Sequence, residues 1–291
     1  MCQVSVIPED YMFPAVGAYI MRYEISVVTL IMGAFATLRH YNELADFLTM
    51  SGYRVLTYDH RGIGRSTAER PKESQTSQML ASDCLALIEH MFGHHPVHVY
   101  GASMGGCVAQ YVALALKASN RLCSLYLAVT SRGSYFQIPL PQSILKFAIS
   151  TFIVKSDTRM MVNSLLPKCF DKEFLNSVDE RTGRLMIDLW TEKWTAEYAD
   201  WFSFADLDAT ASQCPVYATH YLSEDDLKPL VGSNITVHIS MQDELITPEK
   251  QFELAGILKA KIIKFEGGHI LGNTQKKRFY DAVLLHLKQK D

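Results

Sequence analysis

The sequence lacks several features that would assign it to a class at once. Its most apolar stretch, residues 27–38, is interrupted by Gly33 and is far shorter than the roughly 20 residues that span a bilayer. Basic runs are also missing, since Lys276-Lys277-Arg278 is short and the formal net charge is -3. We therefore expect neither a transmembrane segment nor a nucleic-acid partner.

Cysteine is sparse, and its positions are scattered. The six cysteines lack the short paired spacing of a zinc site or a compact disulfide framework: Cys2, Cys84, Cys107, Cys123, Cys169 and Cys214. We therefore expect reduced, mostly buried thiols and no metal site. The first residues, Met1-Cys2-Gln3-Val4, do not begin a basic segment followed by an apolar run and a small-residue cleavage site. A cytoplasmic location is the corresponding expectation.

The composition is that of a globular protein, with 48% hydrophobic and 20% charged residues in 291. Short aliphatic runs alternate with longer amphipathic segments through most of the chain, and the alternation predicts an α/β fold with a mainly parallel sheet and helices on both faces. Expected strands are residues 27–32, 54–58, 97–100, 122–129, 235–240 and 262–265. Expected helices are residues 41–50, 77–91, 105–116, 248–258 and a last one from 276 onward.

The alternation is interrupted between the two ends of the chain. We expect one core domain made of residues 1–132 and 214–291, with residues 133–213 inserted as a helical cap. The insertion carries a stripe at spacings of four, four and three: Trp190, Trp194, Tyr198 and Trp201. These aromatics either pack the cap against the core or line a substrate pocket, and both interpretations can hold together.

One short segment carries the strongest chemical signal. Gly101-Ala102-Ser103-Met104-Gly105 follows the expected strand 97–100 and opens the expected helix 105–116. A serine on so sharp a turn needs strained backbone angles, and side chains two positions away would collide with the adjoining strand and helix. Glycine removes that collision. The helix N-terminus beneath the serine offers free N–H groups to a developing oxyanion.

Together with a second segment, these residues resemble the α/β-hydrolase superfamily. The second segment, Tyr-Asp-His-Arg-Gly-Ile-Gly-Arg-Ser at residues 58–66, looks like the strand-to-loop segment that these hydrolases carry two elements before the serine. The resemblance runs from residue 27 to about residue 287 apart from the cap. We interpret this second segment as structural, with Asp59 and Arg61 bracing loops and Gly62 and Gly64 allowing turns.

The resemblance implies a catalytic triad in the order serine, acid, histidine. Ser103 would be the nucleophile, Asp243 the acid after strand 235–240, and His269 the base after strand 262–265. The adjacent Glu244 and the cluster at residues 224–226 are the competing acids. Five of the other histidines lie away from the expected position: His60, His94, His95, His98 and His238.

The resemblance also implies an oxyanion hole formed by two backbone N–H groups, those of Met104 and Ala34. The second assignment is open, because Met32-Gly33 stands where many relatives have His-Gly, and Phe35 is the alternative donor. The swap removes an imidazole that braces the loop. We further expect four side chains to contact the substrate: Phe35, Trp190, Trp194 and Tyr198.

The activity implied is that of a serine esterase or lipase, which cleaves carboxylic esters of fairly apolar acyl groups through an acyl-enzyme and needs neither metal nor organic cofactor. An amidase or aminopeptidase remains open, and it would need acidic groups in the cap such as Glu180, Asp188, Glu192, Glu197 or Asp200. A slow-turnover receptor of the same fold is the second alternative. The partner expected is a small-molecule ester, and the oligomeric state is left open.

Overall fold

The core of the structure is a seven-stranded sheet in the order β1-β3-β2-β4-β5-β6-β7. The computed structural model describes residues 4–5, 26–70, 73–133, 158–202, 212–270 and 275–289. Six strands are parallel, and β1 pairs antiparallel with β3 at one edge. The strands are β1 (Val4–Ser5), β2 (Val27–Ile31), β3 (Arg54–Tyr58), β4 (Val97–Ala102), β5 (Leu122–Ala128), β6 (Ile235–Ser240) and β7 (Lys261–Phe265). The predicted mainly parallel sheet is confirmed.

Helices cover both faces of this sheet, because side chains of each central strand point alternately to opposite sides. In β5, Leu125 and Leu127 pack in one hydrophobic cluster, while Tyr126 and Ala128 pack in another. The first cluster is covered by α2 (Ser77–Phe92), α3 (Met104–Ala118) and α11 (Pro248–Leu258), and the second by α1 (Asn42–Met50) and α12 (Lys276–Lys288). Short helical segments complete the core: α9 (Cys214–Thr219), α10 (Glu224–Leu227) and two 3₁₀ turns at Leu38–Tyr41 and Lys228–Leu230.

Local signals in the sequence set the helix ends. Thr76 caps α2 by accepting a hydrogen bond from the Met79 N–H at 3.2 Å, and Gly93 ends that helix with a φ of 53°. Pro248 begins α11, where its missing N–H costs no helical hydrogen bond. The predicted bounds of β3, β6 and α11 agree with the structure, whereas α3 begins one residue earlier than predicted, at Met104.

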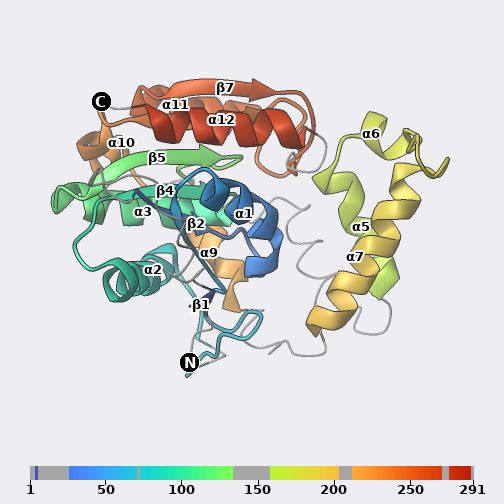
Figure 1. Cartoon of the computed structure of the whole chain (residues 1–291), viewed down its shortest axis with the longest axis horizontal. Helices are drawn as coiled ribbons and strands as arrows, with labels where there is room; N and C mark the ends of the chain where they lie inside the picture. Colours follow the sequence, from blue (N-terminus) through green and yellow to red (C-terminus); the bar gives the residue numbers. More distant parts are fainter. Residues whose placement is uncertain are drawn as a thin grey trace, which may run out of the picture.

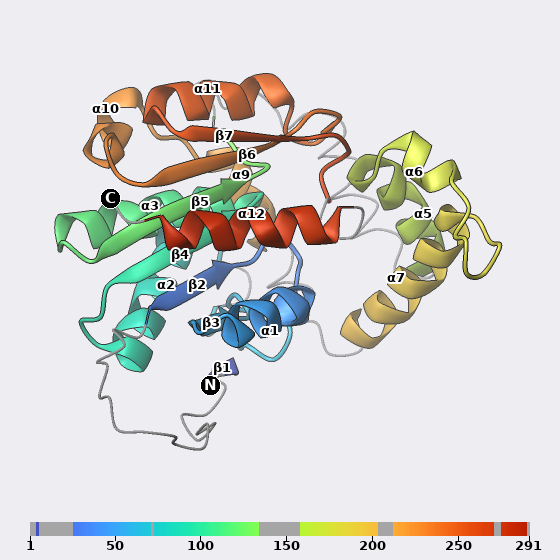
Figure 2. The ribbon, with the colours of Figure 1, turned by 45° about the horizontal axis from the view of Figure 1, so that its top comes forward.

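An inserted helical region lies between β5 and β6. It contains α5 (Thr158–Cys169), α6 (Lys172–Asn176) and α7 (Met186–Phe202). Figures 1 and 2 show these helices on the side toward which the strand arrows point, beyond the carboxyl ends of the parallel strands. Their shared apolar cluster also contacts Leu245 and Ile270 of the core. In the described ranges, none of the helices combines the length and apolar character needed to cross a bilayer.

Candidate active site

Ser103 lies on a strained turn between β4 and α3. Its backbone has φ 55° and ψ -125°, in a region that side chains disfavour and that is tolerated only where the surroundings hold it. Neighbouring groups supply that support, since the Ser103 N–H donates to the Ala128 carbonyl at 2.9 Å and the Thr130 hydroxyl donates to the Ser103 carbonyl at 2.8 Å. The turn is therefore fixed from β5.

The glycines on either side of Ser103 are required by packing. A Cβ added to Gly101 would overlap the Gly105 carbonyl, and one added to Gly105 would overlap the carbonyl oxygens of Ile31 and Met32. These are buried backbone atoms at the start of α3 and the end of β2, so they have little room to move. The predicted need for glycine at both positions is confirmed.

His269 and Asp243 are joined by a hydrogen bond. His269 follows β7, Asp243 follows β6, and the distance from His269 Nδ1 to Asp243 Oδ2 is 2.8 Å. The Asp243 side chain is fully buried and the His269 side chain is 9% exposed. Because a carboxylate only accepts, Nδ1 carries the shared hydrogen, and Nε2 keeps its lone pair for a proton.

Asp243 is held by three further donors. The N–H groups of Leu245 and Ile246 donate to Oδ1 at 2.9 and 3.0 Å, and Gln251 Nε2 donates to Oδ2 at 3.0 Å. Gln251 also accepts from the Ser240 N–H at 3.1 Å. Sequence reasoning missed Gln251, although a signal exists: it is a polar residue on the buried stripe of α11 that continues through Leu254, Ala255 and Leu258.

The competing acids lie elsewhere. Glu244 is exposed and pairs with Lys168 of α5 at 3.5 Å, while Asp226 caps α10 through Ser223. Among the acids considered from the sequence, the structure therefore brings Asp243 to His269.

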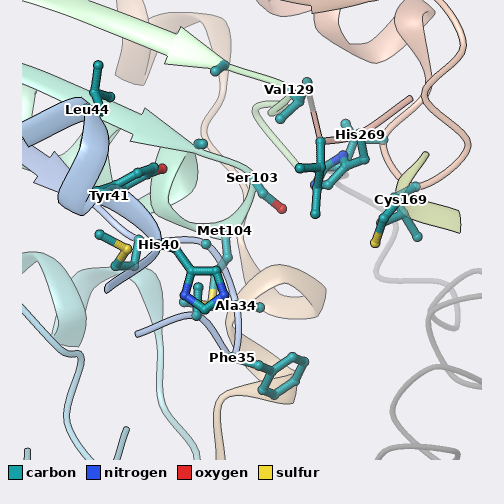
Figure 3. Close-up of a pocket in the computed structure, with 18 of the residues that line it drawn as sticks. Ala34, Phe35, His40, Tyr41, Leu44, Ser103, Met104, Val129, Cys169 and His269 are labelled. Carbon is teal, nitrogen blue, oxygen red and sulfur yellow. The ribbon is translucent and has the colours of Figure 1, made fainter. Parts of the chain in front are cut away.

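A cavity of about 580 Å³ lies over Ser103. Ser103, Met104 and His269 line it together with Ala34 and Phe35, and Figure 3 shows these five side chains around the same space. The inserted helices contribute one wall through Leu165, Cys169, Trp190 and Trp194. At the opposite end, the lining passes between α1 and α12 along Tyr41, Leu44, Tyr100 and Phe279.

The N–H groups expected to hold an oxyanion are available. In the described part of the chain, neither the Met104 nor the Ala34 N–H has a hydrogen-bond acceptor. The Phe35 N–H instead donates to Gln213 Oε1 at 3.2 Å. This difference favours Ala34 over Phe35 as the second donor.

The segment at residues 58–66 has the predicted structural role, and through Asp59 and His60 it braces the loop that carries Ala34. Asp59 Oδ1 accepts from the Leu38 N–H at 2.7 Å, and Arg61 forms an ion pair with Asp83. Gly62 and Gly64 have positive φ values of 75° and 56°. His60 Nε2 lies 3.1 Å from the Met32 carbonyl, so this chain braces the loop with an imidazole despite having Met32 at the usual histidine position.

Two aromatics of the inserted helices both pack with their neighbours and line the cavity. Trp190 and Trp194 are 7% and 6% exposed, pack with Phe170 in the apolar cluster of the inserted helices, and also line the cavity. The side chains of Tyr198 and Trp201, the remaining members of the aromatic stripe, lie outside the described residues. The same holds for the side chains of Met160, Met161 and Phe202 and for all of Phe204, which are further apolar residues of the insertion. Tyr198 therefore stays a prediction.

His238 is a further histidine of the cavity wall. It is 2% exposed and stacks on Phe265 at 4.2 Å between ring centroids. Burial lowers the pKa of His238 to about 3, so the ring stays neutral.

This fold and this serine turn define an α/β-hydrolase. A family model described as serine aminopeptidase, S33, matches residues 24–220, and the chain belongs to that family. The match covers most of the sheet, the serine turn and the inserted helices.

Curated relatives match shorter segments. A Mycobacterium tuberculosis protein described as non-heme bromoperoxidase BpoC is 41% identical over 94 residues, which is 32% of this chain and 33% of that protein. The non-heme chloroperoxidase of Streptomyces lividans is 39% identical over 74 residues, 25% of this chain and 26% of its own. The matches thus span a third or less of these relatives.

Solved structures match over nearly the whole chain. The α/β hydrolase MGS-M2 from a Medee basin deep-sea metagenome library has a TM-score of 0.77 at 18% identity, covering 100% of this chain and 95% of its own. The enol-lactonase of Burkholderia xenovorans LB400 has a TM-score of 0.73 at 21% identity, with coverages of 99% and 96%. The esterase EaEST of Exiguobacterium antarcticum has a TM-score of 0.71 at 18% identity, with coverages of 91% and 92%. At these identities the likeness shows the fold alone.

Proposed function

We propose that this protein is a serine hydrolase that cleaves carboxylic esters through an acyl-enzyme on Ser103. The observation that carries the proposal is the strained Ser103 turn in the same cavity as a His269 ring whose Nδ1 is bonded to buried Asp243. This arrangement leaves Nε2 able to accept the serine proton. Met104 and Ala34 also line this cavity, and their N–H groups have no acceptor among the residues that the structure describes.

The proposed reaction has two halves. His269 Nε2 takes the Ser103 proton while the serine oxygen attacks the ester carbonyl, and the N–H groups of Met104 and Ala34 hold the oxyanion. Collapse of the tetrahedral intermediate breaks the ester bond, and His269 passes its proton to the leaving alcohol. Water, deprotonated by the same imidazole, then attacks the acyl-enzyme and releases the acid. Asp243 fixes the tautomer and stabilises the imidazolium.

We further propose that the acyl group is fairly apolar and that the region assigned to residues 133–213 acts as a cap over it. Trp190, Trp194 and Leu165 support this, because they form an apolar wall of the cavity. Each methylene buried against such a wall contributes about 0.8 kcal/mol, so two added carbons are expected to raise kcat/KM by roughly tenfold until the pocket is full.

A series of p-nitrophenyl esters from acetate to decanoate, kept below micelle-forming concentrations, measures this preference. We expect a rising kcat/KM up to medium chain length, and a smaller rise in Trp194→Ala. Phe170→Leu is the matched control, because Phe170 is buried in the same cluster but lies outside the lining of the cavity. A flat profile from acetate to octanoate contradicts the apolar pocket, and an equal effect of both variants returns Trp194 to a packing role.

An aminopeptidase is the alternative that the family description favours. Such an enzyme needs an unpaired acid near the nucleophile to hold the substrate ammonium. In the described lining of the cavity, the acidic residue is Glu43, which forms an ion pair with Lys276 at 2.7 Å. Glu180, Asp188 and Glu192 are exposed and lie outside that lining, while the side chains of Glu197 and Asp200 lie outside the described residues.

Parallel assays separate these functions. We expect p-nitrophenyl butyrate to be hydrolysed with a kcat/KM at least about 100-fold above that of alanine p-nitroanilide, because the described residues that line the cavity include an apolar wall and no unpaired carboxylate. The reverse order would favour the aminopeptidase. A single slow acylation without turnover would favour the receptor instead.

A further inference from the structure

The loop between β2 and α1 is held at three points by side chains from other parts of the chain. We call residues 32–38 the oxyanion loop, because they include Ala34. His60 Nε2 lies 3.1 Å from the Met32 carbonyl, Asp59 Oδ1 accepts from the Leu38 N–H at 2.7 Å, and Gln213 Oε1 accepts from the Phe35 N–H at 3.2 Å. Gln213 thus acts at the centre of the loop, next to Ala34.

The bond to Gln213 fixes a conformation that the backbone disfavours. Phe35 has a φ of 59°, and a non-glycine residue in this region costs of the order of 1 kcal/mol or more unless its surroundings compensate. Because the Phe35 N–H belongs to the peptide unit that also contains the Ala34 carbonyl, holding it restricts the orientation of Ala34. With this bond made, the Ala34 N–H lies at the cavity and has no acceptor within the described ranges.

Gln213 is itself placed for this contact. Its side chain is buried, at 2% exposed, and its Nε2 has no acceptor in the described part of the chain. The contact that orients the side-chain amide is therefore the one that its oxygen makes with the Phe35 N–H. The preceding residue, Ser212, is anchored to the core, since its carbonyl accepts from the Gln75 N–H at 2.8 Å and its hydroxyl accepts from Gln75 Nε2 at 2.7 Å.

We propose that Gln213 is a positioning residue that turns the oxyanion loop so that the Ala34 N–H faces the oxyanion. The inference rests on the proposed function, because it concerns the same serine chemistry. It adds that the segment by which the chain returns from the inserted helices to the core contributes to the oxyanion hole. Gln213 touches the loop through the Phe35 N–H and acts on the reaction only through Ala34.

The test compares Gln213→Met, which keeps the side-chain length but removes the acceptor, with Ser212→Ala. Ser212→Ala removes the hydroxyl that accepts from Gln75 Nε2 and keeps the Ser212 carbonyl that accepts from the Gln75 N–H, so this backbone anchor beside Gln213 and the contact of Gln213 with Phe35 are expected to remain. Active sites are counted by fluorophosphonate labelling, so that rates refer to folded enzyme. We expect Gln213→Met to lower kcat on p-nitrophenyl butyrate by about 10- to 100-fold with KM within about threefold, because the missing alignment acts on the transition state. Ser212→Ala is expected to keep kcat within about threefold.

A second readout separates positioning from a general packing effect. Butylboronic acid forms a tetrahedral adduct on a serine, and its affinity is expected to fall in Gln213→Met by the same factor as kcat/KM. If Gln213→Met does not fold, Gln213→Asn, which withdraws the amide by one methylene, is expected to show the same two losses. Unchanged kcat and boronate affinity, or equal losses in Ser212→Ala, would overturn the role of Gln213. Wild-type protein that takes no fluorophosphonate on Ser103 would instead overturn the proposed function.

Discussion

The hydrogen bonds around Asp243 explain why this residue, and not its neighbour, suits the role of the acid. Both carboxylate oxygens accept two hydrogen bonds each, from Leu245 and Ile246 on Oδ1 and from His269 and Gln251 on Oδ2. An asparagine at position 243 could keep its oxygen toward the N–H groups of Leu245 and Ile246. Its NH2 group would then face the two other donors, His269 Nδ1 and Gln251 Nε2. It would force His269 into the other tautomer and leave a donor of Gln251 unpaired.

Replacing Asp243 by Asn is therefore expected to lower kcat by roughly 10³- to 10⁴-fold, as expected when the tautomer of a triad histidine is wrong. Glu244→Gln is the matched control, and it should retain activity within about twofold, because its exposed pair with Lys168 has little effect on His269. Steady-state hydrolysis of p-nitrophenyl butyrate by both variants provides the measurement. Similar rates for the two variants would move the acid to another residue.

At the level of secondary-structure elements, the start of α3 lies so close to the end of β2 that no side chain fits between them at position 105. Gly105 packs directly on the Ile31 and Met32 carbonyls, so the start of α3 contacts the backbone at the end of β2. The oxyanion loop begins at that same end. A shift of α3 would therefore disturb both Ser103 and the Ala34 side of the cavity.

Two glycine substitutions with opposite expected signs test this packing. Gly105→Ala should lower the free energy of unfolding by about 3 kcal/mol or more, because backbone atoms must move to admit the Cβ. Gly256→Ala, at an exposed interior position of α11 with open space around the added Cβ, should raise it by about 0.5–1 kcal/mol. Urea unfolding followed by tryptophan fluorescence measures both. An unchanged free energy of unfolding in Gly105→Ala would show that α3 is free to move away from β2.

At the scale of the whole molecule, buried histidines couple folding to pH. His98, His220, His238 and His286 are all 7% exposed or less. Burial lowers the pKa of His98 and His220 to about 4, and that of His238 and His286 to about 3. All four therefore stay neutral in the folded protein over the pH range in which the unfolded chain protonates them.

The sign follows from proton uptake. Each of these pKa values is lower in the folded than in the unfolded state, so between about pH 6.5 and pH 4 unfolding takes up protons and stability falls as the pH falls. One such histidine lowers the free energy of unfolding by about 2 kcal/mol at pH 5. The urea concentration at the midpoint of unfolding should decrease from pH 7.5 to 6 to 5, and it should decrease less steeply in His286→Gln than in wild type. Midpoints that stay constant from pH 7.5 to 5 would contradict neutral burial of these rings.

Together with the resemblance to α/β-hydrolases, the sequence was sufficient to predict the residues of the candidate site that follow strand ends. Ser103, Asp243 and His269 follow three parallel strands, and the carboxyl ends of such strands meet at one edge of a sheet. Contacts that depend on side-chain placement were not predictable. Gln213 and Phe35 are 178 positions apart, and no local pattern marks either residue as the partner of the other. The spacing of Trp190 and Trp194 predicted a helix and left two roles open, packing or lining a pocket. In the structure, both rings pack among the inserted helices and also line the cavity.

Intact-mass analysis after treatment with a fluorophosphonate tests whether Ser103 is the nucleophile of an ester hydrolase. We predict one adduct per chain on wild-type protein and none on Ser103→Ala, whose fold is retained because the change removes only a hydroxyl at the cavity. Ester turnover should fall by several orders of magnitude in parallel. An adduct on Ser103→Ala equal to that on wild type, or full turnover without Ser103, would contradict the account.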